Sequence, residues 1–76
     1  MAELLEFLAR KLVDSPDEVR VERVEEDDTV VLRLHVAEDD LGKVIGRQGR
    51  IARALRTIVR AGSATTGRKL LLEIVE

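Results

Sequence analysis

The sequence predicts an α+β fold in which a three-stranded sheet packs against three helices in the order α-β-β-α-α-β. Three observations predict it: leucines repeat at helical spacing near the amino end, the middle of the chain alternates as strands do, and a glycine-bounded turn separates two further helical segments before a last alternating one. The chain has 76 residues, of which 45 % are hydrophobic and 37 % are charged. That composition is typical of one small globular domain covering residues 1–76.

The first helix is predicted over residues 3–13, where apolar side chains recur on one face: Leu4, Leu5, Leu8 and Leu12. It ends before Pro16, because the residue that precedes a proline disfavours the helical conformation. Phe7 is the single aromatic residue of the chain, and we expect it in the core beneath this helix.

Two strands are predicted next, over residues 19–24 and 29–36, and the polar residues 25–28 between them indicate a hairpin. The second strand carries an apolar face made of Val30, Leu32, Leu34 and Val36. The four acidic residues of the turn could hold a cation, but neither a glycine nor the spacing of a Ca²⁺-binding loop accompanies them. We therefore expect a solvated tip there and no metal site.

Two helices and a strand complete the prediction. A short helix over residues 38–44 begins with three acids, which are favourable at the positive end of a helix. A longer helix is expected over residues 50–61, with Gly62 as the glycine that ends it. Residues 63–67 are expected to form a loop and residues 68–76 the last strand.

Charge is distributed unevenly along the chain. Residues 1–40 hold 13 acidic and 5 basic residues, and residues 41–76 hold 8 basic and 2 acidic ones, so the two parts carry −8 and +6. A polyanion responds to the local field rather than to the total of −2, because salt screens charges beyond about 10 Å. Charge alone also fits a solvated basic helix beside an acidic hairpin.

The most informative segment is the turn Gly46-Arg47-Gln48-Gly49 between the two predicted helices. It lacks the residues of a P-loop, the spacing of a dinucleotide-binding loop and the apolar helix of a membrane GxxxG motif. Because glycine has no Cβ, a sugar-phosphate backbone can lie against such a turn, and the start of the next helix faces it with N–H groups. Arg47 and Gln48 offer a charged and a neutral donor. The spacing by itself equally fits a plain helical corner.

Basic residues continue on both sides of this turn. Lys43 and Arg50 flank it, and Arg53, Arg56 and Arg60 follow Arg50 along one stripe of the helix, away from its apolar face. Like charges at this spacing are mildly destabilising, so a stripe without acidic partners indicates a ligand that neutralises it. We therefore include Lys43, Arg50 and Arg53 in the predicted site, and place Arg56 and Arg60 further from the turn.

The run Gly-Lys-Val-Ile-Gly-x-x-Gly-Arg-Ile, residues 42–51, resembles the signature of the KH domain. The element order resembles the type II (bacterial) KH fold over essentially the whole chain, and the small stand-alone bacterial KH RNA-binding proteins of the KhpA family are similar in length and motif. The resemblance implies single-stranded RNA in a groove, its backbone clamped by Gly46, Arg47, Gln48 and Gly49. It further implies that Val44 and Ile45 form the apolar groove floor and core, with the strand edge near residues 32–36 as the opposite wall.

The turn, the basic stripe and the resemblance together predict a cytoplasmic single-stranded RNA-binding protein that needs no cofactor. The resemblance implies that it is a post-transcriptional regulator or RNA chaperone. The resemblance implies a homodimer, or a heterodimer with a larger KH-containing RNA-binding protein. The alternative is a dimerisation or adaptor module in which RNA binding is secondary, built on exposed Val31, Leu71 and Val75. No enzyme is predicted, because no nucleophile–base set or carboxylate pair accompanies the single His35. No membrane partner is expected, since no apolar run approaches the roughly 18 residues of a membrane span.

Overall fold

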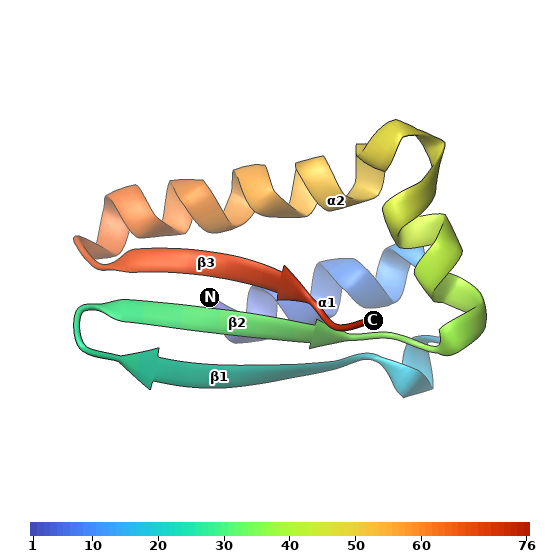
Figure 1. Ribbon diagram of the computed structural model, residues 1–76, viewed down its shortest axis with the longest axis horizontal. Helices are drawn as coiled ribbons and strands as arrows, with labels where there is room; N and C mark the ends of the chain where they lie inside the picture. Colours follow the sequence, from blue (N-terminus) through green and yellow to red (C-terminus); the bar gives the residue numbers. More distant parts are fainter.

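The computed structural model describes the backbone of residues 1–76 and every side chain except that of Arg47. Its elements are α1 (Ala2–Leu12), the short 3-10 helix η1 (Pro16–Glu18), β1 (Arg20–Glu26), β2 (Thr29–His35), α2 (Glu38–Thr66) and β3 (Lys69–Ile74). The predicted α-β-β-α-α-β order is confirmed, because α2 consists of two helical arms that meet at a sharp corner (Figure 1).

The sheet has the order β1-β2-β3, so β2 is its central strand. β1 and β2 pair antiparallel through the predicted hairpin, whereas β2 and β3 pair parallel, with Val31 opposite Leu71. A parallel pair needs a long crossover, and α2 supplies it. In Figure 1, α2 runs alongside β3 while α1 lies behind the strands. β3 therefore forms one free edge of the sheet, next to α2.

The core lies between one face of the sheet and the two helices. Its buried members come from both helices, from the central strand and from the residue before β1: Leu5 and Ala9 of α1, Val19 before β1, Val30, Leu32 and Leu34 of β2, and Leu55 and Val59 of α2. The prediction for Phe7 was wrong, because its side chain is 56 % exposed. Leu5 and Ala9, one helical turn apart, form the inner stripe of α1, and Phe7 lies outside this stripe with Lys11 over its ring.

The helix α2 differs from prediction at both the turn and the end. Its helical assignment continues from Glu38 to Thr66, but Gln48 and Gly49 have φ values of 62° and 69°, which divide it into a first arm (residues 38–47) and a second arm (residues 50–66). The helix passes Gly62, where a Cβ would collide with the Met1 side chain. It ends at Gly67, which has a φ of 74° and donates its N–H to the Ser63 carbonyl at 3.1 Å. Among the described residues, no helix combines the length and apolar character needed to cross a membrane.

Candidate nucleic-acid interface

The turn of residues 46–49 forms the corner between the two arms of α2, at the end of the molecule where the first arm rises from the sheet (Figure 1). Its backbone leaves the regular helix at Gln48 and Gly49, both in the left-handed region. A Cβ placed on Gly46 or Gly49 would meet no atom within 4 Å, so the corner faces open space. The predicted side-chain contact of Arg47 lies outside the described residues. A ligand can therefore approach the main chain of this corner directly.

The apolar residues before the turn divide between core and surface. Val44 is 1 % exposed, as its predicted place in the core requires. Ile45 is 39 % exposed, so its side chain does not serve as core packing. Ile51, on the other side of the turn, packs against the buried cluster. The turn thus carries one exposed aliphatic side chain beside its glycines, and the helix on each side is anchored by an apolar neighbour.

The flanking basic residues differ in what they contact. The Nζ of Lys43 lies 3.3 Å from Oδ1 of Asp14, so this charge already has an acidic partner. Arg50 and Arg53 are exposed, and neither forms a salt bridge among the described side chains. Of the three electrostatic additions to the predicted site, the two arginines are therefore free to meet a ligand, whereas Lys43 is engaged.

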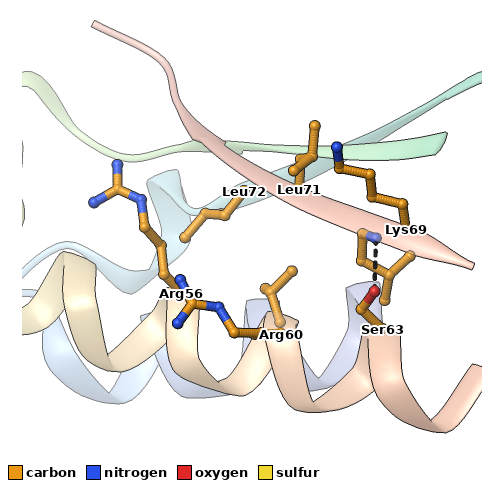
Figure 2. Close-up of a pocket in the computed structure, with 8 residues that line it drawn as sticks. Arg56, Arg60, Ser63, Lys69, Leu71 and Leu72 are labelled. Atoms are coloured by element: carbon orange, nitrogen blue, oxygen red, sulfur yellow. Dashed lines mark hydrogen bonds between the residues drawn. The ribbon is translucent and has the colours of Figure 1, made fainter.

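A groove lies between the second arm of α2 and the free edge of β3, with a volume of about 320 Å³ (Figure 2). Its lining combines basic, polar and apolar side chains: Arg56, Val59, Arg60, Ser63, Lys69, Leu70, Leu71 and Leu72. In Figure 2, Leu72 points from the strand toward α2, while Leu71 points the other way. Among the described residues that line it, the groove has three cations and no carboxylate, and its floor is aliphatic, a combination suited to a ligand with apolar faces and negative charge.

The position of this groove corrects the predicted opposite wall. Residues 32–36 belong mostly to β2, which is central, and both Leu32 and Leu34 are buried under the helices. β3 forms the wall instead. Arg56 and Arg60, which were expected to lie too far along the helix, line the groove directly. The lining residues of β3 were missed, because nothing in a single sequence tells which strand occupies the edge.

Ser63 fixes the two walls of the groove to each other. Its hydroxyl donates to the Arg68 carbonyl at 2.7 Å and accepts from the Leu70 N–H at 3.3 Å, the latter drawn in Figure 2. Arg68 itself is held outside the groove by Glu25, 3.3 Å from its guanidinium. Hydrogen bonds from Arg23 and Arg68 lower the pKa of Glu25 below its usual value. The acidic hairpin tip thus neutralises Arg68 and leaves the groove cations unpaired.

Comparisons with known proteins give matches over nearly the whole chain. The family model for the KhpA/KhpB KH domain matches residues 2–74. A protein of Clostridium acetobutylicum named RNA-binding protein KhpA is 47 % identical over 75 residues, which cover 99 % of this chain and all of the relative. An Aquifex aeolicus protein of the same name is 50 % identical over 76 residues, covering all of this chain and 96 % of the relative.

One solved structure has the same fold within a longer chain. It is the crystal structure of Aquifex aeolicus Era bound to GDP and aluminium fluoride, with a TM-score of 0.62 and 20 % sequence identity. The match covers 96 % of this chain and 28 % of the Era chain, so the chain spans little more than a quarter of that protein. At this identity the likeness concerns the fold alone.

Proposed function

The chain belongs to the KhpA/KhpB KH-domain family, and from this premise we propose that it binds single-stranded RNA, gripping the sugar-phosphate backbone at the turn of residues 46–49. The observation that carries the proposal is the open corner between the arms of α2, where neither glycine has a neighbour within 4 Å of its Cβ position. Related proteins named RNA-binding protein KhpA are similar in sequence to this chain over nearly its whole length.

The corner offers two kinds of donor to a phosphate. The helical backbone is interrupted at Gln48 and Gly49 and resumes at Arg50, and the start of a helix presents N–H groups and a positive dipole end to an anion. The exposed side chain of Gln48 adds neutral donors, and those of Arg50 and Arg53 add charge. Ile45, exposed beside the glycines, offers an aliphatic surface to a sugar or base.

From the corner, the RNA continues along the second arm into the groove against β3. Arg56 and Arg60 supply positive charge on one wall, while Val59, Leu70 and Leu72 supply the apolar floor on which bases lie. The chain has one aromatic residue, and the groove has none, so the base stacking that strengthens many RNA modules is missing there. Binding by one copy is therefore weak, and a second copy or partner domain raises it through effective concentration.

The decisive experiment replaces the two side chains at the tip of the turn. We expect Arg47→Asp/Gln48→Asp to abolish binding of a fluorescent oligoribonucleotide, because a strand of phosphates then meets two carboxylates. The control is Arg20→Asp/Arg23→Gln on β1, which changes the net charge by the same three units at the opposite edge of the sheet. Circular dichroism checks that both proteins fold. A folded turn variant that binds RNA as tightly as the control would refute the proposal.

We further propose that the protein acts in the cytoplasm as a post-transcriptional regulator or RNA chaperone, and that it works as a homodimer or with a larger KH-containing RNA-binding protein. Pairing supplies the avidity that a single aliphatic groove lacks. The test measures the stoichiometry of the RNA complex and the oligomeric state of the protein over the same range of protein concentrations. RNA binding that rises more steeply with protein concentration where the dimer forms supports the proposal. Tight RNA binding by a strict monomer contradicts it.

A second candidate function, a protein-interaction module, has its own observation. Apart from Ile45 beside the turn, large apolar side chains are exposed on two surfaces of the described structure. One is formed by Met1 and the α1 residues Leu4, Phe7 and Leu12, and the other by Leu71 on the open sheet face opposite half-buried Val31. Val75, which was expected in the same patch, is half-buried. Sedimentation of the wild type and of the Leu4→Glu and Leu71→Glu variants distinguishes the two surfaces. Only the variant with a charge inside the true interface should sediment with a lower mass than the wild-type oligomer.

A further inference from the structure

One charged residue, Asp40, is buried although no step of RNA binding uses it. Its side chain is 2 % exposed, and it is the sole polar or charged residue buried among the described ones. Its carboxylate accepts two backbone hydrogen bonds, from the Asp14 N–H at 3.1 Å and from the Ser15 N–H at 2.9 Å. These donors lie 25 and 26 residues away in the chain, where α1 ends and η1 begins. Asp40 therefore joins α2 to a distant segment.

This contact differs from the role that the sequence alone suggests for the acid. Asp40 is the third residue of α2, where a carboxylate commonly reaches back to the start of its own helix. Here the N-cap residue of α2 is Ala37, for which the structure has no side-chain cap hydrogen bond, and both carboxylate oxygens of Asp40 face another segment. Glu38 and Asp39 remain exposed and can serve the helix dipole. The burial of Asp40 is thus a tertiary contact, and capping does not account for it.

The first arm of α2 has few other attachments. Among the side chains of this arm that the structure describes, only Asp40 and Val44 are buried, whereas the second arm buries Ala52, Leu55 and Val59. The ion pair of Lys43 with Asp14 reaches the same segment that Asp40 holds, but it is exposed. The turn of residues 46–49 lies at the far end of this arm. Its position relative to the groove depends on how firmly the arm is held.

We infer that Asp40 is a positioning residue for RNA binding, which holds the first arm of α2 on the segment of residues 14–15 and thereby fixes the corner beside the groove. The inference rests on the proposed RNA-binding function. A hydrogen bond to a charged acceptor inside the protein is stronger than a neutral one, and a buried carboxylate tolerates few alternative arrangements. Release of the arm lowers the apparent affinity in proportion to the fraction of molecules with the corner in place.

The experiment compares Asp40→Asn with Asp39→Asn. Both variants lose one negative charge on the same helical turn, but Asp39 is exposed. An asparagine at position 40 has one acceptor oxygen for two N–H donors and places its own NH₂ against the second donor. We expect Asp40→Asn to bind an oligouridine about tenfold more weakly than the wild type. This is the loss that results when the fraction of molecules with the corner correctly placed falls to about a tenth. Asp39→Asn is expected to bind at least as tightly as the wild type.

A second readout separates positioning from global stability. Amide hydrogen exchange at residues 46–50 should become faster in Asp40→Asn, while exchange in β2 stays protected. Val30→Ala, which removes buried volume in β2, should destabilise the protein but leave the RNA affinity unchanged. A folded Asp40→Asn protein that binds RNA like Asp39→Asn, or a Val30→Ala protein that loses as much affinity, overturns the inference.

The wild type alone provides a further test if Asp40→Asn does not fold. When Asp40 couples the two segments, the amides of Asp14 and Ser15 and those of residues 46–50 exchange through one shared opening with the same denaturant dependence. Unrelated openings overturn the inference. If the wild type binds no RNA, the proposed function fails, and the exchange measurement still decides whether Asp40 positions the corner.

Discussion

Removing the two arginines of the groove tests whether RNA follows the surface that the structure presents. Arg56 and Arg60 line the groove from the second arm, and neither has an acidic partner among the described residues. The double variant Arg56→Gln/Arg60→Gln keeps two long polar side chains but removes both charges. Because both side chains are exposed, we expect little change in stability.

The magnitude follows from the number of unpaired cations. If four of them meet phosphates in the wild type, the logarithm of the affinity should fall with the logarithm of salt concentration with a slope of about −2.8, since each phosphate on a single strand contributes about −0.7. The double variant retains two contacts, and its slope should be about −1.4. Between 50 and 200 mM salt, the wild type should therefore lose affinity about 50-fold and the variant about 7-fold.

Fluorescence anisotropy with an oligouridine at four or five salt concentrations measures both slopes. The control variant is Arg20→Gln/Arg23→Gln, which removes two charges from β1, at the edge of the sheet away from the groove. We expect its slope to equal that of the wild type. Equal slopes for the groove variant and the wild type would show that RNA does not follow the second arm, whatever happens at the turn.

Three further predictions concern the fold and its charges. Leu34→Ala, at a side chain with no exposure, should lower the free energy of unfolding by about 2–5 kcal/mol in urea denaturation, and a value near zero would contradict the assigned core. In Gly49→Ala the new methyl group would contact no neighbouring side chain, but the alanine would have to adopt a φ of 69°. We therefore expect the free energy of unfolding to fall by about 1 kcal/mol in the same measurement. Unchanged stability would show that the backbone of the corner relaxes. In an NMR titration, Glu25 should have a pKa below that of an ordinary glutamate. Its stabilising effect is present at neutral pH and should be lost as the pH falls through that lowered pKa. Arg68→Gln should raise the pKa of Glu25, and an unchanged pKa would exclude the contact between them.

Local patterns account for the elements that were predicted correctly. The alternation of Val30, Leu32 and Leu34 specifies a strand with one buried face, because a shift by one residue would expose all three. The two glycines at residues 46 and 49 indicate the turn, and the structure has a positive φ at Gly49 and at Gln48 before it. The family motif around that turn could likewise be read directly from neighbouring residues.

Errors arose where a local pattern allowed two outcomes. Gly62 and Gly67 are both able to end a helix, but α2 continues through Gly62, and the left-handed residue that ends it is Gly67. Phe7 was assigned to the core by its residue type, although Leu5 and Ala9 form the buried stripe of α1. Lys43 stays a predicted site residue, and its ion pair with Asp14, 3.3 Å away on the segment after α1, is a contact that no local pattern indicates.

The sequence by itself determined the kind of protein: the order of its elements, the glycine corner and the basic stripe that follows it, because each depends on residues close together in the chain. Only the tertiary structure decided that β3 forms the free edge, that Arg56 and Arg60 line a groove with it, and that Asp40 holds the first arm of α2. These features join residues far apart in sequence, and the parallel pairing of β2 with β3 and the burial of a carboxylate arise from packing energies that no local pattern encodes.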